Sequence, residues 1–203
     1  MSENTGPFRA LTPIVLASAS PRREELLSGT GLAFEILPSE AEEPRPGPDE
    51  TPGAYACRMA WLKAREVASR RPKAVVIGAD TVVAVGRDIL GKPRDRDQAR
   101  RMLGLLSGRE HQVVTGCAVV SGEESQDFFV STAVRFADLS PEEIEAYTAL
   151  PEPYDKAGGY AIQGQGAFLI REIRGSYTNV VGLPVSELLE VLKTWGVAVP
   201  RNG

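Results

Sequence analysis

The sequence predicts an α/β fold, in which helices flank a mixed central β-sheet and a deep cleft at the edge of the sheet gathers the functional residues. Short β-branched runs occur among amphipathic segments along the chain, which indicates both strands and helices. These elements do not follow a strict βαβ order, so a mixed sheet is expected rather than a parallel one. The length of 203 residues fits a single domain, or two tightly joined lobes.

The N-terminal part is predicted to form a strand, a helix and a second strand. Residues 1–10 are polar and are expected to be flexible. Leu11–Ala17 and Leu32–Leu37 are the two predicted strands. Between them, Ser20 offers an N-cap and Pro21 the first position of a short helix.

A loop and a second helix follow. Residues 38–50 are rich in Pro, Glu and Gly, which is typical of a loop, and Thr51-Pro52 begins the helix. Ala74–Ile77 is a buried β-branched run that stops at Gly78, so Asp80 is expected near the end of a strand.

The C-terminal half adds strands and three helices. Gln112–Val120 and Phe128–Phe136 are predicted to pair as antiparallel neighbours, and Phe168–Ile173 is a further strand. Ser140–Glu143 is a capping box that begins a helix through about Leu150. The apolar faces of the helices before and after it consist of Ala99, Met102, Leu103 and Leu106, and of Leu188, Val191, Leu192 and Trp195.

Composition narrows the class of protein. The net charge of -4 argues against stable nucleic-acid binding, which usually needs a basic surface. Cys57 and Cys117 are the two cysteines, and free thiols in a reducing cytoplasm fit them better than a disulfide. No apolar run approaches the roughly 20 residues of a membrane helix, so no membrane partner is expected.

Several motifs place small residues beside charged ones. Ser20–Arg23 puts two guanidinium groups at a helix N-terminus, which favours an anion, although a capped helix with two solvated arginines explains the motif equally well. Asp80 offers a carboxylate for a divalent ion or for a proton from water, or else caps a turn. Glu42 and Glu43 are a solvated pair unless their loop folds over the same cleft.

Other polar residues have weaker signals. Lys92 lies between Gly91 and Pro93, which suits a phosphate contact or an ordinary turn, and Lys63 on the second helix is expected to reach solvent. Gln163 can present a donor and an acceptor to a base edge. His111, the single histidine, is interpreted as structural. The stretches Tyr177–Asn179 and Gly182–Pro184 are interpreted as a loop that enters the last helix and has a packing role.

Taken in order, the motifs resemble the Maf family of nucleoside triphosphate pyrophosphatases. The matching stretches are LASASPRREELL (16–27), GADTVV (78–83), GKPRD (91–95), LSGREHQVVTG (106–116), DKAGGYAIQG (155–164) and GSYTNVVGLP (175–184). The resemblance implies a Maf/ITPase-like fold and a nucleoside triphosphate as substrate. It also implies a divalent cation, Mg²⁺ or Mn²⁺, as cofactor, and it leaves open whether the protein forms a homodimer.

The resemblance assigns roles residue by residue. Asp80 would be the proton acceptor and a metal ligand, and Glu43, with Glu42 as the alternative, would be the second acidic residue. The residues at phosphate-contacting positions are Ser18, Arg22, Arg23, Lys63 and Lys92.

Substrate choice follows from three positions. Family members that act on dTTP and UTP have the residues found here as Arg22, Thr81 and Gln163. These are expected to meet around the base, with the Thr81 hydroxyl or Arg22 donating to a carbonyl. The alternatives are a pyrophosphatase for 7-methyl-GTP or other modified nucleotides, and a non-catalytic nucleotide-binding regulator of septum formation.

Overall fold

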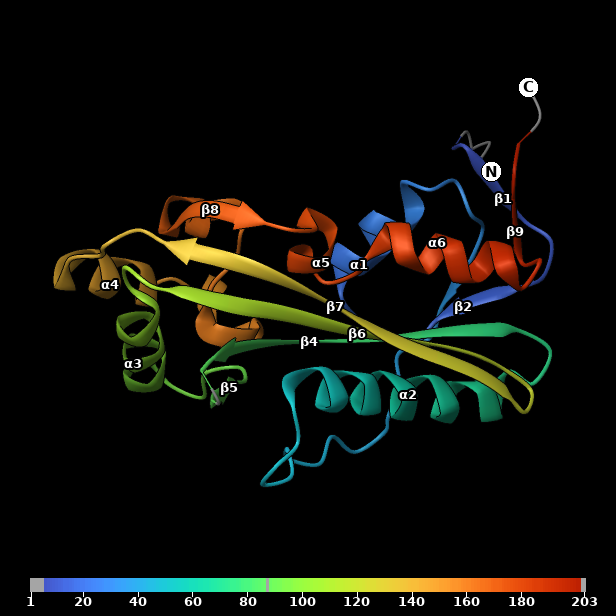
Figure 1. Cartoon of the computed structure of the whole chain (residues 1–203), viewed down its shortest axis with the longest axis horizontal. Coiled ribbons are helices and arrows are strands. Elements are labelled where there is room, and N and C mark those ends of the chain that lie inside the picture. The colour runs from blue at the N-terminus through green and yellow to red at the C-terminus, as the bar shows by residue number, and fades with distance from the viewer. Residues whose placement is uncertain (1–5, 87, 202–203) are drawn as a thin grey trace.

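In the computed structural model of the chain, residues 6–86 and 88–201 are described. Figure 1 shows an elongated, twisted sheet with helix α2 (Pro52–Arg70) along one face and helices α1 (Pro21–Ser28) and α6 (Val185–Thr194) over the other. The predicted α/β class with a mixed central sheet flanked by helices is confirmed.

The main sheet has the strand order β3-β2-β4-β6-β7-β8, with β5 paired to β4. Strand β2 runs parallel to β3 and β4, and the other pairs are antiparallel. The strands are β2 (Ile14–Leu16), β3 (Glu35–Ile36), β4 (Val75–Val85), β5 (Asp88–Leu90), β6 (Glu110–Ser121), β7 (Glu124–Phe136) and β8 (Ile170–Arg174).

One edge of β4 is shared between two short partners. Strand β2 pairs with Val75–Ile77, and β5 pairs with Val83–Val85. Residues 78–82 lie between these pairings, so neither β2 nor β5 covers their edge. On its other side β4 pairs continuously with β6 from Val76 to Ala84. The sheet therefore stays intact while leaving a local opening at its centre.

The prediction that Asp80 lies near a strand end is wrong. Strand β4 continues to Val85, because Thr81, Val82 and Val83 are β-branched and pair in register with β6. Asp80 lies in the middle of the strand, opposite Gly116.

The N-terminal segment is more ordered than predicted. Residues 1–5 lie outside the described part of the chain, but Phe8–Ala10 form strand β1, which pairs with β9 (Ala198–Pro200) near the C-terminus. Arg201 donates from its backbone N–H to Pro7 O, 2.9 Å away, and extends this contact. The expectation of flexibility is therefore wrong for residues 8–10.

The predicted helices agree with the structure because their signals are local. Helix α1 begins at Pro21, and the Thr51 side chain caps α2 by accepting from Ala54 N. Helix α4 (Pro141–Thr148) has the predicted capping box. The four apolar residues predicted for α3 (Arg96–Leu106) are all buried.

Two C-terminal segments differ from the predictions. The predicted strand 168–173 begins only at Ile170, because Gly164–Leu169 form a 3-10 turn. The predicted loop at Tyr177–Asn179 is the short helix α5 (Tyr177–Val181), which the Ser176 side chain caps through Asn179 N.

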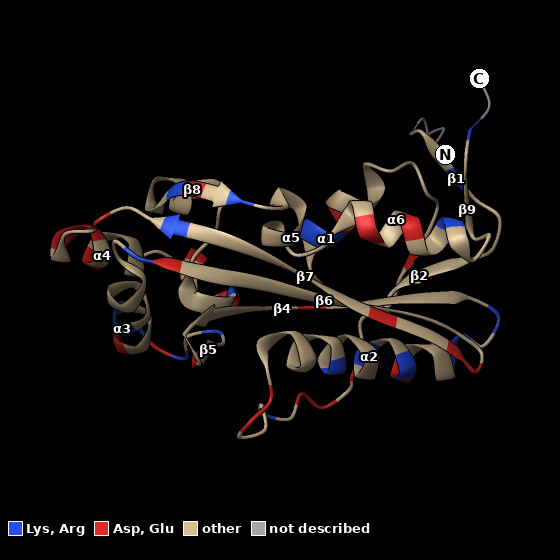
Figure 2. Ribbon diagram, viewed as in Figure 1, with Lys and Arg blue, Asp and Glu red and all other residues tan. Residues whose placement is uncertain are grey.

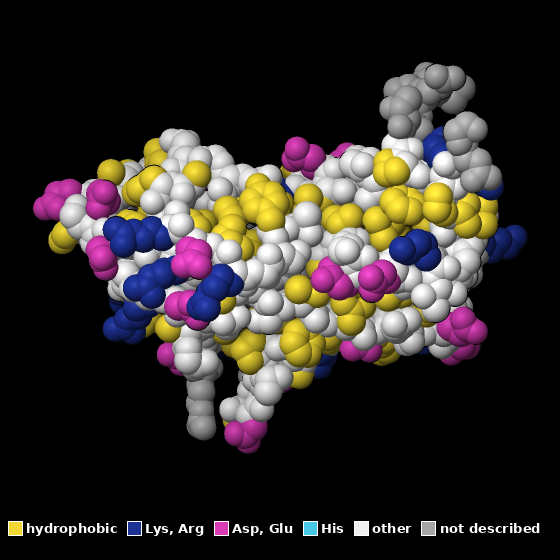
Figure 3. Space-filling model, turned by 45° about the horizontal axis from the view of Figure 1, so that its top comes forward, with side chains coloured by type: hydrophobic (Ala, Val, Ile, Leu, Met, Phe, Trp, Pro, Cys, Tyr) yellow, Lys and Arg dark blue, Asp and Glu magenta, His cyan; other side chains and the backbone are white. Residues whose placement is uncertain are grey.

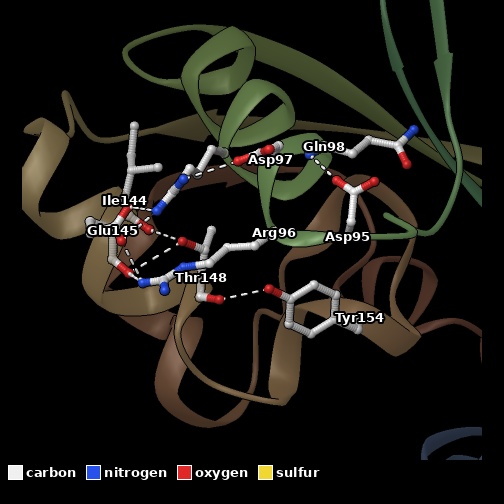
Figure 4. Close-up of polar contacts among 9 residues, drawn as sticks. Asp95, Arg96, Asp97, Gln98, Ile144, Glu145, Thr148 and Tyr154 are labelled. Carbon is white, nitrogen blue, oxygen red and sulfur yellow. Dashed lines mark hydrogen bonds and ion pairs between the residues drawn. The ribbon is translucent and has the colours of Figure 1, made fainter.

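Polar contacts fasten α4 beside α3, at the left end of Figure 1. Figure 4 shows Arg96 paired with Glu145, at 2.5 Å, and the Tyr154 hydroxyl donating to Thr148 O at 2.7 Å. Tyr154 belongs to the 3-10 turn Glu152–Asp155. This contact anchors the start of the segment that carries residues 155–163 along the cleft.

Candidate active site

A cleft of about 510 Å³ lies around the open edge of β4. The site residues predicted from the sequence that line it are Arg22, Arg23, Glu43, Lys63, Asp80, Thr81, Lys92 and Gln163. The predicted Ser18 does not line the cleft itself, but its Oγ lies 3.4 Å from Arg23 Nη1.

Side-chain alternation along β4 divides the cleft into two halves. Val76 packs in the core under α2, whereas Ile77 packs in the core under α1 and α6. Because successive strand residues point to opposite faces, Asp80 faces α2 and Thr81 faces α1. The contacts agree: Asp80 meets Lys63 of α2, and Thr81 meets an arginine of α1.

Two glycines let α2 come close to the sheet. A Cβ on Gly78 would lie 2.2 Å from Ala60 O, and one on Gly116 would lie 2.3 Å from the carbonyl carbon of Ala56. Gly78 and Gly116 therefore permit a backbone contact that side chains would prevent. Lys63 is one helical turn beyond Ala60, so the same contact brings its ammonium to β4.

Lys63 joins the two predicted acidic residues. Its Nζ lies 2.7 Å from Asp80 Oδ1 and 2.9 Å from Glu43 Oε1. The Lys63 and Asp80 side chains are each 14% exposed, whereas that of Glu43 is 56% exposed. The loop of residues 38–50 thus folds over the cleft and brings Glu43, rather than Glu42, into contact with Lys63.

The charges around Glu43 favour its ionised form. Partial burial acts to raise the pKa of the Glu43 carboxyl, but the hydrogen bond and charge of Lys63 outweigh burial and hold that pKa below its ordinary value. Lys92 and Arg23 lower it further. The carboxylates of Asp80 and Glu43 also affect Tyr55. Burial raises the pKa of the Tyr55 hydroxyl, and these two negative charges raise it further.

Arg23 is held firmly on the other face of β4. Its Nε donates to Gly182 O at 2.8 Å, and its Nη2 donates to Thr81 Oγ1 at 3.0 Å. Burial lowers the pKa of the guanidinium, an effect that the charge of Asp80 opposes. An arginine still keeps its charge in such surroundings. The chain thus presents a fixed cation at the cleft.

Arg22 lies on the rim, opposite the segment after α4. Its Nη1 lies 3.6 Å from Asp155 Oδ2, and Asp155 is also 2.5 Å from Lys156 Nζ. Burial acts to raise the pKa of Asp155, but Lys156 and Arg22 together hold it below its ordinary value. This pairing links α1 to the wall that carries Gln163.

Sequence reasoning missed several residues of the site. Tyr55, Lys156 and Gly182 line the cleft, and Thr115 lies directly behind Thr81. Thr115 and Asn179 belong to the stretches VVTG and YTNVVGLP, which match the family pattern. Their place in the pattern was the available signal, although the residue types alone suggested only packing.

In the part of the chain that the structure describes, the two cysteines and the single histidine do not form a metal centre. Cys57 and Cys117 are free and buried, and burial raises the pKa of each thiol to about 12. His111 is 2% exposed, and its Nε2 lies 2.6 Å from the Tyr160 hydroxyl, as the structural interpretation predicts. Within residues 6–86 and 88–201, no group of three or more His, Cys, Asp or Glu side chains is placed to hold a metal ion.

Charge on the outer surface is mixed. Figure 2 shows basic and acidic residues interspersed on α3 and α6, and in Figure 3 the basic side chains at the left end lie next to acidic ones. Ion pairs at that end join Arg96 and Arg100 to Glu145. Among the described helices, none is long and apolar enough to cross a membrane.

Comparison with known proteins is consistent with this geometry. Residues 13–195 match the family model described as "Maf-like protein". A dTTP/UTP pyrophosphatase of Syntrophotalea carbinolica is 52% identical over 95% of this chain and 89% of that protein. Proteins with the same name from Syntrophus aciditrophicus and Symbiobacterium thermophilum are 50% and 47% identical, over 90% and 94% of this chain and 90% and 97% of their own lengths.

Among solved structures, a nucleoside-triphosphatase, or dITP/XTP pyrophosphatase, from Mycobacterium abscessus matches with 20% identity and a TM-score of 0.43. That match covers 68% of this chain and 94% of the other, and a likeness this weak supports no functional comparison.

Proposed function

The chain belongs to the Maf-like protein family, and from this membership we propose that it is a nucleoside triphosphate pyrophosphatase that hydrolyses dTTP and UTP to the monophosphate and pyrophosphate. Relatives that are 47–52% identical over at least nine-tenths of the chain are named dTTP/UTP pyrophosphatase. The observation in the structure that supports the proposal best is the Lys63 ammonium bound to both Asp80 and Glu43. It places two carboxylates and a cation in the cleft that Arg23 also lines.

The chain's own groups contribute to positioning and charge neutralisation, which are the main requirements of phosphoryl chemistry. We assign Arg23, Lys63 and Lys92 to the phosphate oxygens, with Ser18 holding Arg23, and Arg22 and Gln163 to the base. Asp80 accepts a proton from the attacking water as the water oxygen bonds to the α-phosphorus. The bond from that phosphorus to the bridging oxygen breaks, and pyrophosphate leaves with the electron pair.

The residues fit a divalent cation, Mg²⁺ or Mn²⁺, that arrives with the nucleotide. Asp80 and Glu43 supply carboxylate oxygens, which such cations prefer, and the Lys63 ammonium already lies against both of them as a cation would. Two carboxylates do not complete a coordination shell, so phosphate oxygens would supply further ligands. When bound, the cation would neutralise phosphate charge.

We further propose a cytoplasmic location, since both cysteines are free, and a nucleotide rather than a nucleic acid as the partner. The family resemblance leaves open whether the chain forms a homodimer.

The test is a panel of nucleoside triphosphates incubated with the purified protein and Mg²⁺ or Mn²⁺, with pyrophosphate release as the readout. We expect turnover of dTTP and UTP, and at least about 100-fold less in a parallel preparation of Asp80→Asn, which controls for contaminating hydrolases. Turnover of 7-methyl-GTP instead would move the protein to the other substrate group. Nucleotide binding without any turnover would favour the regulator.

A further inference from the structure

Three fully buried polar side chains lie behind Thr81. They are Thr115 on β6, Thr132 on β7 and Asn179 on α5, each with 0% exposure. A buried polar group without a partner costs about 1–3 kcal/mol, so such a cluster persists only when its hydrogen bonds are made. Their partners fix the direction of each bond.

Asn179 can adopt one amide orientation only. Its Oδ1 accepts from Thr115 N at 3.1 Å, and its Nδ2 donates to Val113 O at 3.0 Å and to Thr132 Oγ1 at 2.8 Å. A backbone N–H cannot accept and a carbonyl cannot donate, so a flipped amide would lose two of these bonds. Asn179 therefore ties α5 to β6 and β7 in a single arrangement.

The Thr115 hydroxyl has a single proton, and Asn179 uses it. Thr115 Oγ1 donates to Asn179 O at 2.9 Å, where the carbonyl can only accept. Thr81 Oγ1 lies 3.0 Å from Thr115 Oγ1, in a pair of residues directly opposite each other on β4 and β6. With its own proton committed, Thr115 must accept in this bond, so Thr81 must donate.

The same reasoning reaches Arg23. Thr81 Oγ1 accepts from Arg23 Nη2, which agrees with a hydroxyl proton that points to Thr115. Arg23 has five N–H groups. Three of them contact Gly182 O, Thr81 Oγ1 and Ser18 Oγ. Two remain for a ligand.

We propose that Thr115 is a positioning residue for the nucleotide: together with the carbonyl of Asn179, it directs the Thr81 hydroxyl and so holds the Arg23 guanidinium in place for phosphate. The identity of the ligand rests on the proposed function. Thr81 then acts through Arg23 and has no proton to offer a base carbonyl. The hypothesis that Thr81 donates to such a carbonyl is replaced by this one.

Two substitutions separate the hydroxyl from the shape of the side chain. Thr115→Val keeps the branched shape and removes the hydroxyl, whereas Thr115→Ser keeps the hydroxyl and removes a methyl group. We expect Thr115→Val to lower kcat/KM for dTTP and UTP alike by about tenfold, the upper end of the effect of one lost hydrogen bond. Thr115→Ser should stay within about threefold of the unmodified protein. Melting temperatures of all variants give the structural effect separately.

A double-substitution cycle tests whether Thr115 acts through Thr81. If it does, Thr115→Val should add less than about twofold to the loss already caused by Thr81→Val. Multiplying losses would overturn the proposal. So would a Thr115→Val variant with a lowered melting temperature but unchanged kcat/KM, because that result would describe a purely structural residue.

Binding of inorganic triphosphate with Mg²⁺, measured by calorimetry, tests the positioning role of Thr115 independently of turnover. Thr115→Val should weaken this binding by about tenfold, while Thr115→Ser should not. If the unmodified protein fails to hydrolyse any nucleotide but this difference is seen, the proposed function fails and the positioning role stands. Equal triphosphate affinity in all three proteins would overturn the positioning role even if dTTP is hydrolysed.

Discussion

Lys63 Nζ lies 2.7 Å from Asp80 Oδ1. Asp80 is in the middle of the continuous strand β4 rather than at a strand end. Both side chains are only 14% exposed, so the ion pair is partly shielded from water and from salt. The ammonium therefore gives the largely buried carboxylate a partner of opposite charge. Under the proposed function, a cation would compete with Lys63 for Asp80, and the substrate phosphates would compete with Asp80 for Lys63.

Asp80→Asn should reduce turnover by at least about 100-fold, because the amide can neither accept the proton nor contribute a charge. Folding should survive, since Asn has nearly the same shape and Lys63 keeps its contact with Glu43. Pyrophosphate release measures the first effect and thermal melting the second. Near-normal release from a folded Asp80→Asn protein would remove Asp80 from the mechanism.

Glu43 and Glu42 provide a matched pair, because they are adjacent and only Glu43 contacts Lys63. Glu43→Gln should lower kcat by at least about tenfold, as expected for a lost metal or general-base contribution. Glu42→Gln should change it by less than about twofold, as for other exposed substitutions. Steady-state kinetics with dTTP at saturating Mg²⁺ decides between them. The reverse order of effects would show that Glu42 replaces Glu43 once substrate is bound.

The predictions that held depend on local patterns. The capping box at Ser140, the apolar face of α3 and the β-branched run of β6 specify their elements within a few residues. The sequence places Asp80 near a strand end because the β-branched run stops at Gly78, and a glycine is typical of a strand end. In the fold, that glycine instead accommodates the backbone of α2.

For a similar reason, the sequence predicts some residues of the site and not others. Charged residues such as Arg23 and Glu43 stand out in the sequence, whereas Thr115 and Asn179 do not. The role of these two depends on a contact across 64 positions of the chain, which only the assembled sheet and α5 create. Likewise, the donor and the acceptor of each hydrogen bond can be assigned only from the full set of partners.

Gly116→Ala should disturb both stability and activity. Its Cβ would lie 2.3 Å from the Ala56 carbonyl carbon and 2.4 Å from Cys57 N, both of them backbone atoms. The resulting shift of α2 should cost about 1–3 kcal/mol of unfolding free energy, as in other overpacked cores. Because Gly116 lies opposite Asp80, the shift should also separate Lys63 from Asp80 and lower activity per folded molecule.

Gly104→Ala is the matched control for this change. Gly104 lies within α3, and a Cβ there would meet nothing within 4 Å. The substitution should stabilise the protein by about 0.5–1 kcal/mol through helix propensity and leave turnover unchanged. Urea unfolding and dTTP hydrolysis give both quantities. A Gly116→Ala protein as stable as Gly104→Ala would contradict the close contact between α2 and β6.

His111 should make stability depend on pH. Burial lowers its pKa to about 4 from an ordinary value of 6.5, and the charge of Glu110 opposes this shift only in part. The folded state therefore favours the neutral ring. Its contribution is complete above pH 6.5 and is lost as the pH falls towards 4, because the unfolded chain binds the proton first. Between pH 7.5 and 5.0 the loss should be about 2 kcal/mol.

His111→Gln isolates that contribution, because Gln can still hydrogen-bond to Tyr160 but does not titrate. Urea unfolding at the two pH values should show a smaller decrease for the variant than for the unmodified protein. Equal decreases would assign the pH dependence to carboxylates instead.

Discrimination between bases should depend chiefly on Arg22 and Gln163, since the Thr81 proton points to Thr115. Thymine and uracil present the same edge of two carbonyls and one N–H, to which a Gln amide and an Arg donor can pair. Cytosine reverses two of these groups and would leave polar atoms unpaired, which such a pocket rejects strongly. The protein should therefore hydrolyse dTTP and UTP well, and dCTP, CTP, dATP and 7-methyl-GTP poorly.

Arg22→Trp tests this prediction at one of the three positions from which the family resemblance predicts substrate choice. Arg22 is partly exposed on the rim and pairs loosely with Asp155, 3.6 Å away, so its replacement should hardly change the melting temperature. It should nevertheless lower kcat/KM for dTTP by at least about tenfold, because a donor to the nucleotide is lost and the indole ring adds bulk at the cleft. The comparison needs kcat/KM for dTTP and for 7-methyl-GTP in both proteins, since a loss shared equally by the two nucleotides would make Arg22 a phosphate contact. Equal kcat/KM values for the two nucleotides in the unmodified protein would show that these side chains do not select the base.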